Sequence, residues 1–101
     1  MSTRLDVVFQ HRATRDTEEI NAWWRANRPA APDLFLLELR ATLSIAALSP
    51  TLGAPARDVR LAGIRRLILQ RSRYHVYYRV AGPVLEVLAV WHAVRGSGPG
   101  L

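Results

Sequence analysis

Residues 71–91 constrain the fold of this chain more than any other stretch, because they read as two β-strands joined by a tight turn. Side chains along a strand point alternately to opposite faces of a sheet. In 71–80 this alternation gives one face that can be buried, made of Tyr74, Val76, Tyr78 and Val80. It gives a second face of cations and hydrogen-bonding rings, made of Arg71, Arg73, His75, Tyr77 and Arg79. We therefore expect the first strand to separate a core from a surface that prefers water or an anion.

The second run, 84–91, is apolar on both faces, and its only charge is Glu86. Such a strand belongs inside a sheet that is covered on both sides. Strict alternation would place Leu85, Val87, Ala89 and Trp91 on one face and Val84, Leu88 and Val90 on the other. Gly82 accepts positive φ and Pro83 fixes its own φ, which is the chemistry of a turn. The whole stretch predicts a β-hairpin.

The first half of the chain predicts one strand, at 5–9, and two helices. From about residue 10 to 27 apolar residues recur at helical spacing, and Arg28-Pro29 ends this helix because the residue before proline avoids the α region. Only one of the adjacent Trp23 and Trp24 can face the core, so the other should lie at a rim or a partner surface. A second helix is expected over roughly 31–48, with a buried stripe of Phe35, Leu39, Leu43 and Ala46. The corner between the helices is short, so they should form an antiparallel hairpin.

The remaining segments complete a β-α-α-β-β-β order. Residues 51–63 carry glycine and proline and read as a loop, and 64–70 read as a strand. The fold class is therefore α+β, with the helix hairpin packed on one face of a small antiparallel sheet whose last three strands form a meander. We expect one domain over residues 1–95 and a flexible tail over 96–101.

Composition narrows the function classes. The chain has no cysteine and three scattered histidines, so we expect no disulfide, no metal and no cofactor. It has no apolar run of ~18 residues and no signal-peptide core, which favours a soluble cytoplasmic protein without membrane contact. The formal net charge is +6, and all fourteen basic residues are arginine. The guanidinium of arginine is planar and can form paired hydrogen bonds to carboxylate or phosphate. The excess of basic over acidic residues therefore indicates an anionic partner, either nucleic acid or an acidic protein.

Six short motifs occur in order between residues 5 and 95. They are Ala13, Asp16, Ile20 and Trp24 in the first helix; Pro29, Phe35 and Leu39 at the start of the second; Pro50-x-x-Gly53; Ile64-Arg65-Arg66; the strand 73–80; and Val-Leu-x-Val-x-His-x-x-Arg at 87–95. With this spacing the chain resembles the RelE/ParE superfamily of bacterial type II toxins, and more closely its ParE branch. The family fold is the β-α-α-β-β-β order reached above.

The resemblance implies a small toxin that a cognate antitoxin, encoded beside it, holds inactive in a hetero-oligomeric complex. ParE-like members poison DNA gyrase, whereas RelE-like members are ribosome-dependent mRNA endonucleases. The absence of lysine and the closing His-x-x-Arg favour a gyrase inhibitor that is not an enzyme. The alternatives are a RelE-like ribonuclease and a non-toxic module of the same fold that only binds an antitoxin.

Candidate residues follow from the basic strand and from the resemblance. A target- or anion-binding surface is expected at Arg65, Arg66, Arg71, Arg73, His75, Arg79, His92 and Arg95. An antitoxin-binding surface is expected at Trp23, Trp24 and Arg28. If the protein is a nuclease, which needs a base, an acid and cations around the phosphorane, the candidates are His92, Tyr77 and Arg79. The competing interpretation is structural: a strand-end histidine held by a hydrogen bond, and a solvated row of arginines.

Overall fold

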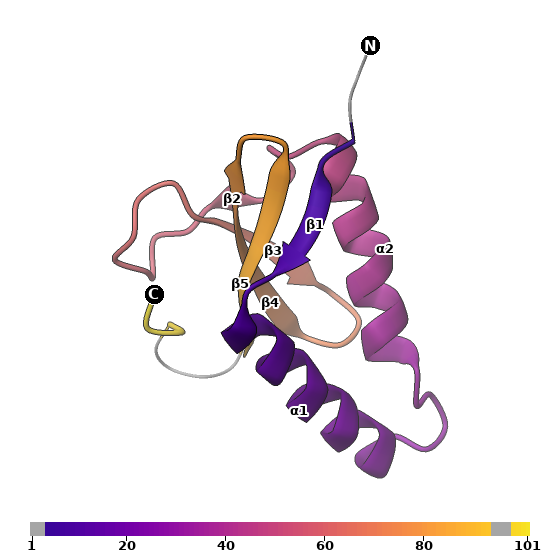
Figure 1. Ribbon diagram of the computed structural model, residues 1–101. Helices are drawn as coiled ribbons and strands as arrows, with labels where there is room; N and C mark the ends of the chain where they lie inside the picture. Colours follow the sequence, from indigo (N-terminus) through magenta and orange to yellow (C-terminus); the bar gives the residue numbers. More distant parts are fainter. Residues whose placement is uncertain (1–3, 94–97) are drawn as a thin grey trace.

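Two helices lie on a five-stranded sheet (Figure 1). The computed structural model describes residues 4–93 and 98–101. Its elements are β1 (Asp6–Phe9), α1 (His11–Asn27), α2 (Leu34–Leu48), β2 (Ala54–Pro55), β3 (Arg65–Leu69), β4 (Tyr74–Ala81) and β5 (Val84–His92). The α+β class and the element order are confirmed, with the two-residue β2 as an addition.

β5 is flanked by two strands, and this sets the sheet order β1-β5-β4-β3-β2. It runs antiparallel to β4, and β4 runs antiparallel to β3, so the predicted meander is confirmed. On its other side β5 pairs with β1 in parallel, from Asp6 opposite Val84 to Phe9 opposite Val87. The sheet is therefore mixed. Residues 29–33 form the corner between the helices, so α2 begins at Leu34 rather than near residue 31.

The main core lies between the helices and the sheet. Phe35 and Leu39 of α2 meet Val76 and Tyr78 of β4, and all four are buried, as predicted. Val80 was expected on the same buried face but is 44% exposed. The reason is that β3 begins opposite Tyr78, which leaves the end of β4 without a neighbour on that side.

A β-bulge changes which side chains of β5 face the helices. Tyr77 lies opposite Ala89 but Tyr78 lies opposite Val87, so Leu88 is an extra residue in β5. The prediction of strict alternation along 84–91 holds as far as Leu88 and is wrong from Ala89 onward. Leu85, Val87 and Val90 join the main core, whereas Leu88, Ala89 and Trp91 belong to the opposite face.

That opposite face, called the outer face below, carries a second apolar cluster. Tyr77 was predicted to be exposed there but is fully buried, together with Ile64, Leu88 and Ala89. The cover comes from the loop before β3, through Ala56 and Val59, and from Trp91 and Leu101. Of the tail at 96–101, residues 96 and 97 lie outside the described residues, and the backbone N–H of Arg60 donates to the carbonyl of Leu101 at 2.6 Å. β5 is thus covered on both sides, which explains why it is apolar on both.

Candidate functional site

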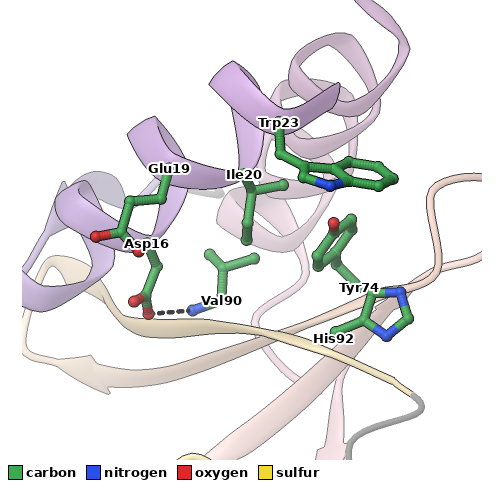
Figure 2. A pocket seen from close by; sticks show the side chains of 7 residues that line it. All are labelled: Asp16, Glu19, Ile20, Trp23, Tyr74, Val90 and His92. Atoms are coloured by element: carbon green, nitrogen blue, oxygen red, sulfur yellow. Dashed lines mark hydrogen bonds between the residues drawn. The ribbon is translucent and has the colours of Figure 1, made fainter. Parts of the chain in front are cut away.

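A cleft of about 390 Å³ opens between α1 and the last residues of β5 (Figure 2). It lies where β1 has ended, because β1 flanks β5 only as far as Val87. Its lining residues are Asp16, Glu19, Ile20, Trp23, Tyr74, Val90 and His92. The cleft therefore combines two carboxylates with aromatic walls, in a chain whose net charge is positive.

Asp16 joins the two sides of this cleft. Its carboxylate accepts a hydrogen bond from the backbone N–H of Val90 at 3.0 Å and lies 3.6 Å from the guanidinium of Arg12. Val90 is beyond the reach of β1, so Asp16 takes the place of a strand carbonyl and satisfies a donor that would otherwise be left unpaired. The aspartate of the first-helix motif thus has a structural role here.

Aromatic rings in edge-to-face contact connect the cleft to the core. The ring of Tyr74 lies 5.0 Å from that of His92 and 5.2 Å from that of Phe35, in edge-to-face arrangements. His92 lies opposite Tyr74 in the sheet and therefore on the helix side. Figure 2 shows Tyr74 between the indole of Trp23 and the ring of His92.

The two adjacent tryptophans divide as predicted. Trp24 is buried, and its indole N–H donates to the carbonyl of Ala31 at 2.7 Å, which fixes the corner between the helices. Trp23 is 46% exposed at the cleft. The guanidinium of Arg28 lies 5.2 Å from the ring of Trp23 and 5.8 Å from that of Trp24. Of the three candidates for antitoxin binding, Trp23 and Arg28 are accessible and Trp24 is a core residue.

The outer face holds a polar group above its apolar cluster. The hydroxyl of Tyr77 donates to Asp58 at 2.5 Å, and the same carboxylate oxygen lies 3.7 Å from the guanidinium of Arg66. Burial and the hydrogen bond to Asp58 raise the pKa of Tyr77 to about 12. Burial, followed by the charge of Arg66, lowers the pKa of His75, whose ring lies 6.4 Å from that of Tyr77. At neutral pH Tyr77 therefore keeps its proton and His75 is neutral.

The predicted row of arginines is not continuous. Arg66 lies on the outer face, but Arg65 points to the helix side, where it donates to the carbonyl of Gly53 at 2.6 Å. Arg79 is at the far end of β4, 3.4 Å from Glu86, which also accepts a hydrogen bond from Gln10. The face was expected to carry cations and hydrogen-bonding rings, and the structure adds two acids to it, Asp58 and Glu86. Arg95 lies outside the described residues.

Arg71 and Arg73 were expected in the strand but lie in the turn before it. The carboxylate of Glu38 in α2 accepts hydrogen bonds from the backbone N–H groups of Arg71 and Ser72 and from the hydroxyl of Ser72, at 2.7–2.9 Å. Arg73 adopts a positive φ of 70°. Both arginine side chains are exposed, so this turn presents two cations to solvent on a backbone that Glu38 fixes.

The Pro-x-x-Gly loop encloses one side chain. The hydroxyl of Tyr78 donates to the carbonyl of Pro50 at 2.7 Å and accepts from the N–H of Gly53 at 3.0 Å. A Cβ at Gly53 would lie 2.8 Å from the ring of Tyr78, which no side chain tolerates without a shift. Glycine is needed here for close approach, and the motif is part of the core.

Some of these groups could be anticipated and others could not. Asp16, Glu19 and Trp23 recur at helical spacing, so a shared surface of α1 was visible in the sequence. Asp58 lies in an aperiodic loop that gives no such signal. Within residues 4–93 and 98–101, no three His, Asp or Glu side chains are grouped to hold a metal ion. In that same part of the chain, no helix is both long and apolar enough to cross a bilayer.

One family model and two solved structures are similar to this chain. The family model for the ParE toxin of the parDE type II toxin–antitoxin system matches residues 7–95. The structure is similar to that of a chromosomal ParDE toxin–antitoxin system from P. aeruginosa, with a TM-score of 0.72, 18% identity, and coverage of 88% of this chain and 96% of that one. It is also similar to the toxin–antitoxin complex RelBE2 from Mycobacterium tuberculosis, with a TM-score of 0.55, 25% identity, and coverage of 89% and 99%. No curated protein is similar enough in sequence to count as a relative.

Proposed function

Because the chain belongs to the ParE toxin family of type II toxin–antitoxin systems, we propose that it inhibits DNA gyrase by binding to it and that a cognate antitoxin neutralises it. The observation that carries this proposal is the separation of the three residues that a nuclease would use. His92 lies on the helix side of the sheet, Tyr77 on the outer face, and Arg79 at the far end of β4.

Proton transfer requires groups within hydrogen-bonding reach of the same reacting atoms, which means ~2.6–3.2 Å. His92 and Tyr77 are on opposite faces and cannot serve one phosphate. The hydroxyl of Tyr77 already donates a hydrogen bond to Asp58. Its raised pKa keeps it protonated at neutral pH, so it is a poor base there. Arg79 lies against Glu86, so part of its charge is already compensated. These placements favour a protein that acts by contact rather than by chemistry.

The contact surface for the target is the β3–β4 turn, and Arg66 adds a further cation on the outer face near the start of β3. Arg71 and Arg73 are exposed there, and their guanidinium groups suit carboxylate or phosphate. For the antitoxin, the surface is the exposed indole of Trp23 with Arg28 and the cleft beside them. An acidic segment that folds on binding would complement the net positive charge of the chain, with its acidic groups beside Arg28 rather than beside the two carboxylates of the cleft. Because gyrase is a cytoplasmic enzyme, the proposed function includes a location in the cytoplasm.

One observation favours the alternative, a RelE-like ribosome-dependent mRNA endonuclease. Arg66, His75 and Tyr77 share the outer face, and the neutral imidazole of His75 is in the protonation state that a general base needs. Asp58 and the loop that carries it cover this group, so it would have to open before an RNA phosphate could reach it.

The deciding experiment compares DNA and RNA damage after induction of the protein without its antitoxin. Wild type, His92→Gln and His75→Gln are induced in parallel, with circular dichroism to confirm that each is folded. Gyrase-dependent DNA breaks are measured beside cleavage of ribosome-bound mRNA. We expect DNA breaks without RNA cleavage, retained in both variants because glutamine keeps hydrogen bonding. RNA cleavage that disappears in either variant would overturn the proposal in favour of the nuclease. Folded wild type with neither kind of damage would indicate a non-toxic antitoxin-binding module.

A further inference from the structure

α2 is apolar on the face that points away from the sheet as well as on the face that meets it. The buried side is made of Phe35, Leu39, Leu43, Ala46 and Ala47. On the opposite side Leu37, Ile45 and Leu48 are 61%, 56% and 59% exposed. A helix that is apolar all round is normally covered all round. The exposed side of α2 therefore has the composition of an interface.

The spacing of these exposed residues is symmetric about one alanine. We call Leu34, Leu37, Ala41, Ile45 and Leu48 the outer stripe, in which Leu34 is half-buried and the rest are exposed. Successive members are three, four, four and three positions apart, so the stripe reads the same in either direction from Ala41. At ~100° per residue, all five lie on one side of the helix.

This symmetry selects the kind of partner. In a two-fold interface the same patch occurs on both subunits, and if residue i meets residue j, then j meets i. An axis through Ala41 and perpendicular to α2 sets Leu37 against Ile45 of a second copy and Leu34 against Leu48 of that copy. Ala41 meets its own equivalent, and its small side chain lets the two backbones approach while the larger ones interdigitate. An unrelated partner would not require the stripe to match itself end to end.

We propose that this protein forms a two-fold symmetric dimer through the outer stripe, with the two α2 helices antiparallel and Ala41 on the axis. The inference stands apart from the choice of gyrase as target. Counting the polar side chains beside the stripe, pairing would remove on the order of 1,000 Å² from water, near the low end for specific interfaces. Each copy carries a net charge of +6, which opposes association. The dimer is therefore weak, and salt strengthens it by screening this repulsion.

Single-cysteine variants give a test of the register, because the chain has no cysteine of its own. A disulfide needs Cα atoms ~4.4–6.8 Å apart, which only residues facing each other across the axis provide. Under mild oxidation Ala41→Cys should cross-link to itself rapidly. Leu37→Cys and Ile45→Cys should each cross-link slowly alone but rapidly when mixed. Self-cross-linking of Leu37→Cys as fast as that of Ala41→Cys would overturn the register and with it the proposed dimer.

Sedimentation of the full chain tests the association itself. The mass of wild type should rise from 11.3 kDa towards twice that value with concentration, and more readily at high salt. Ala41→Arg, which opposes two guanidinium groups on the axis, should weaken the dimer at least tenfold. Leu52→Arg adds the same charge at an exposed leucine outside the stripe and is the matched control. Thermal melts confirm that both variants fold.

Two further outcomes would overturn the dimer. One is a wild type that stays monomeric at every concentration and salt. The other is an Ala41→Arg variant that sediments like wild type but no longer binds the antitoxin, because the outer stripe would then belong to the antitoxin. The effect of salt also distinguishes the dimer from antitoxin binding. Salt should strengthen the dimer, whereas it should weaken the binding of an acidic antitoxin to this basic chain.

Discussion

Asp16 and Val90 are seventy-four positions apart in the chain, yet the carboxylate of one accepts the backbone N–H of the other at 3.0 Å. This bond holds the N-terminal half of α1 to β5 at the level where β1 has ended. The cleft that carries Trp23 and His92 opens around it, so the shape of the cleft depends on this one hydrogen bond.

Replacing Asp16 by alanine should therefore lower stability. The N–H of Val90 would lose its acceptor, which costs ~1–3 kcal/mol for a buried donor. Asp16→Asn keeps an acceptor oxygen and should cost less. Urea unfolding measures the free energy of unfolding of both variants. The control is Glu19→Ala, which removes an exposed carboxylate one turn further along the helix. Its free energy of unfolding should stay within ~0.5 kcal/mol of wild type. Equal losses for Asp16→Ala and Glu19→Ala would contradict the structural role of Asp16.

Tyr77 should make the protein lose stability at high pH. Its pKa is about 12 in the folded chain, against an ordinary value of 10.0. A raised folded-state pKa contributes stability that is fully present below pH ~10 and is lost as the pH rises towards ~12, by up to ~3 kcal/mol. Burial raises the pKa of Tyr78 as well, so two tyrosines contribute.

The measurement is the free energy of unfolding at several pH values for wild type and Tyr77→Phe. The variant should be less stable at neutral pH, because Asp58 loses its hydrogen bond from the hydroxyl. Its free energy of unfolding should also fall less steeply as the pH rises. Phenolate absorbance gives an independent reading of how many tyrosines titrate late. A Tyr77→Phe variant that loses stability as steeply as wild type would show that Tyr77 is not the group responsible.

The two adjacent tryptophans should separate stability from binding. Trp24→Ala removes a buried indole and its hydrogen bond to Ala31, and should cost ~3–5 kcal/mol of stability. Trp23→Ala should change stability little and instead weaken antitoxin binding by ~2 kcal/mol or more, about thirtyfold, as for an aromatic anchor. Denaturant unfolding and titration calorimetry with the antitoxin check the pair. Unchanged affinity in Trp23→Ala would remove the indole from the antitoxin surface.

Glu38 should matter to the basic turn more than any arginine in it. Glu38→Ala leaves the N–H groups of Arg71 and Ser72 without their acceptor and should cost ~1.5–3 kcal/mol, the range for hydrogen bonds to a charged group. Arg71→Ala keeps those bonds and should be near neutral in stability while reducing target binding. Faster hydrogen exchange at residues 70–73 in Glu38→Ala, unmatched in Arg71→Ala, is the diagnostic result. Identical exchange in the two variants would argue against the role of Glu38.

The parts of the fold that the sequence predicted are those with a regular period. Tyr74, Val76 and Tyr78 alternate along β4 and were placed in the core correctly. Along β5 nearly every residue is apolar, so an inserted residue such as Leu88 leaves no mark, and the faces beyond it were assigned wrongly. Arg73 gave no sign of its positive φ, since glycine is the residue that usually signals one. The acceptor that holds this turn lies on α2, thirty-three positions from Arg71.

The pairing of β1 with β5 has a consequence for the order in which the chain can fold. Asp6 and Val84 are opposite each other, so β1, the first strand to be synthesised, cannot pair until β5, the last strand, has been made. During synthesis the helices and the β3–β4 hairpin can form, but the sheet stays incomplete, and closing so long a loop slows folding. A chain that stops at residue 83 should show helix by circular dichroism but no cooperative unfolding. Whatever this protein does to its target, it can begin only after β5 has left the ribosome.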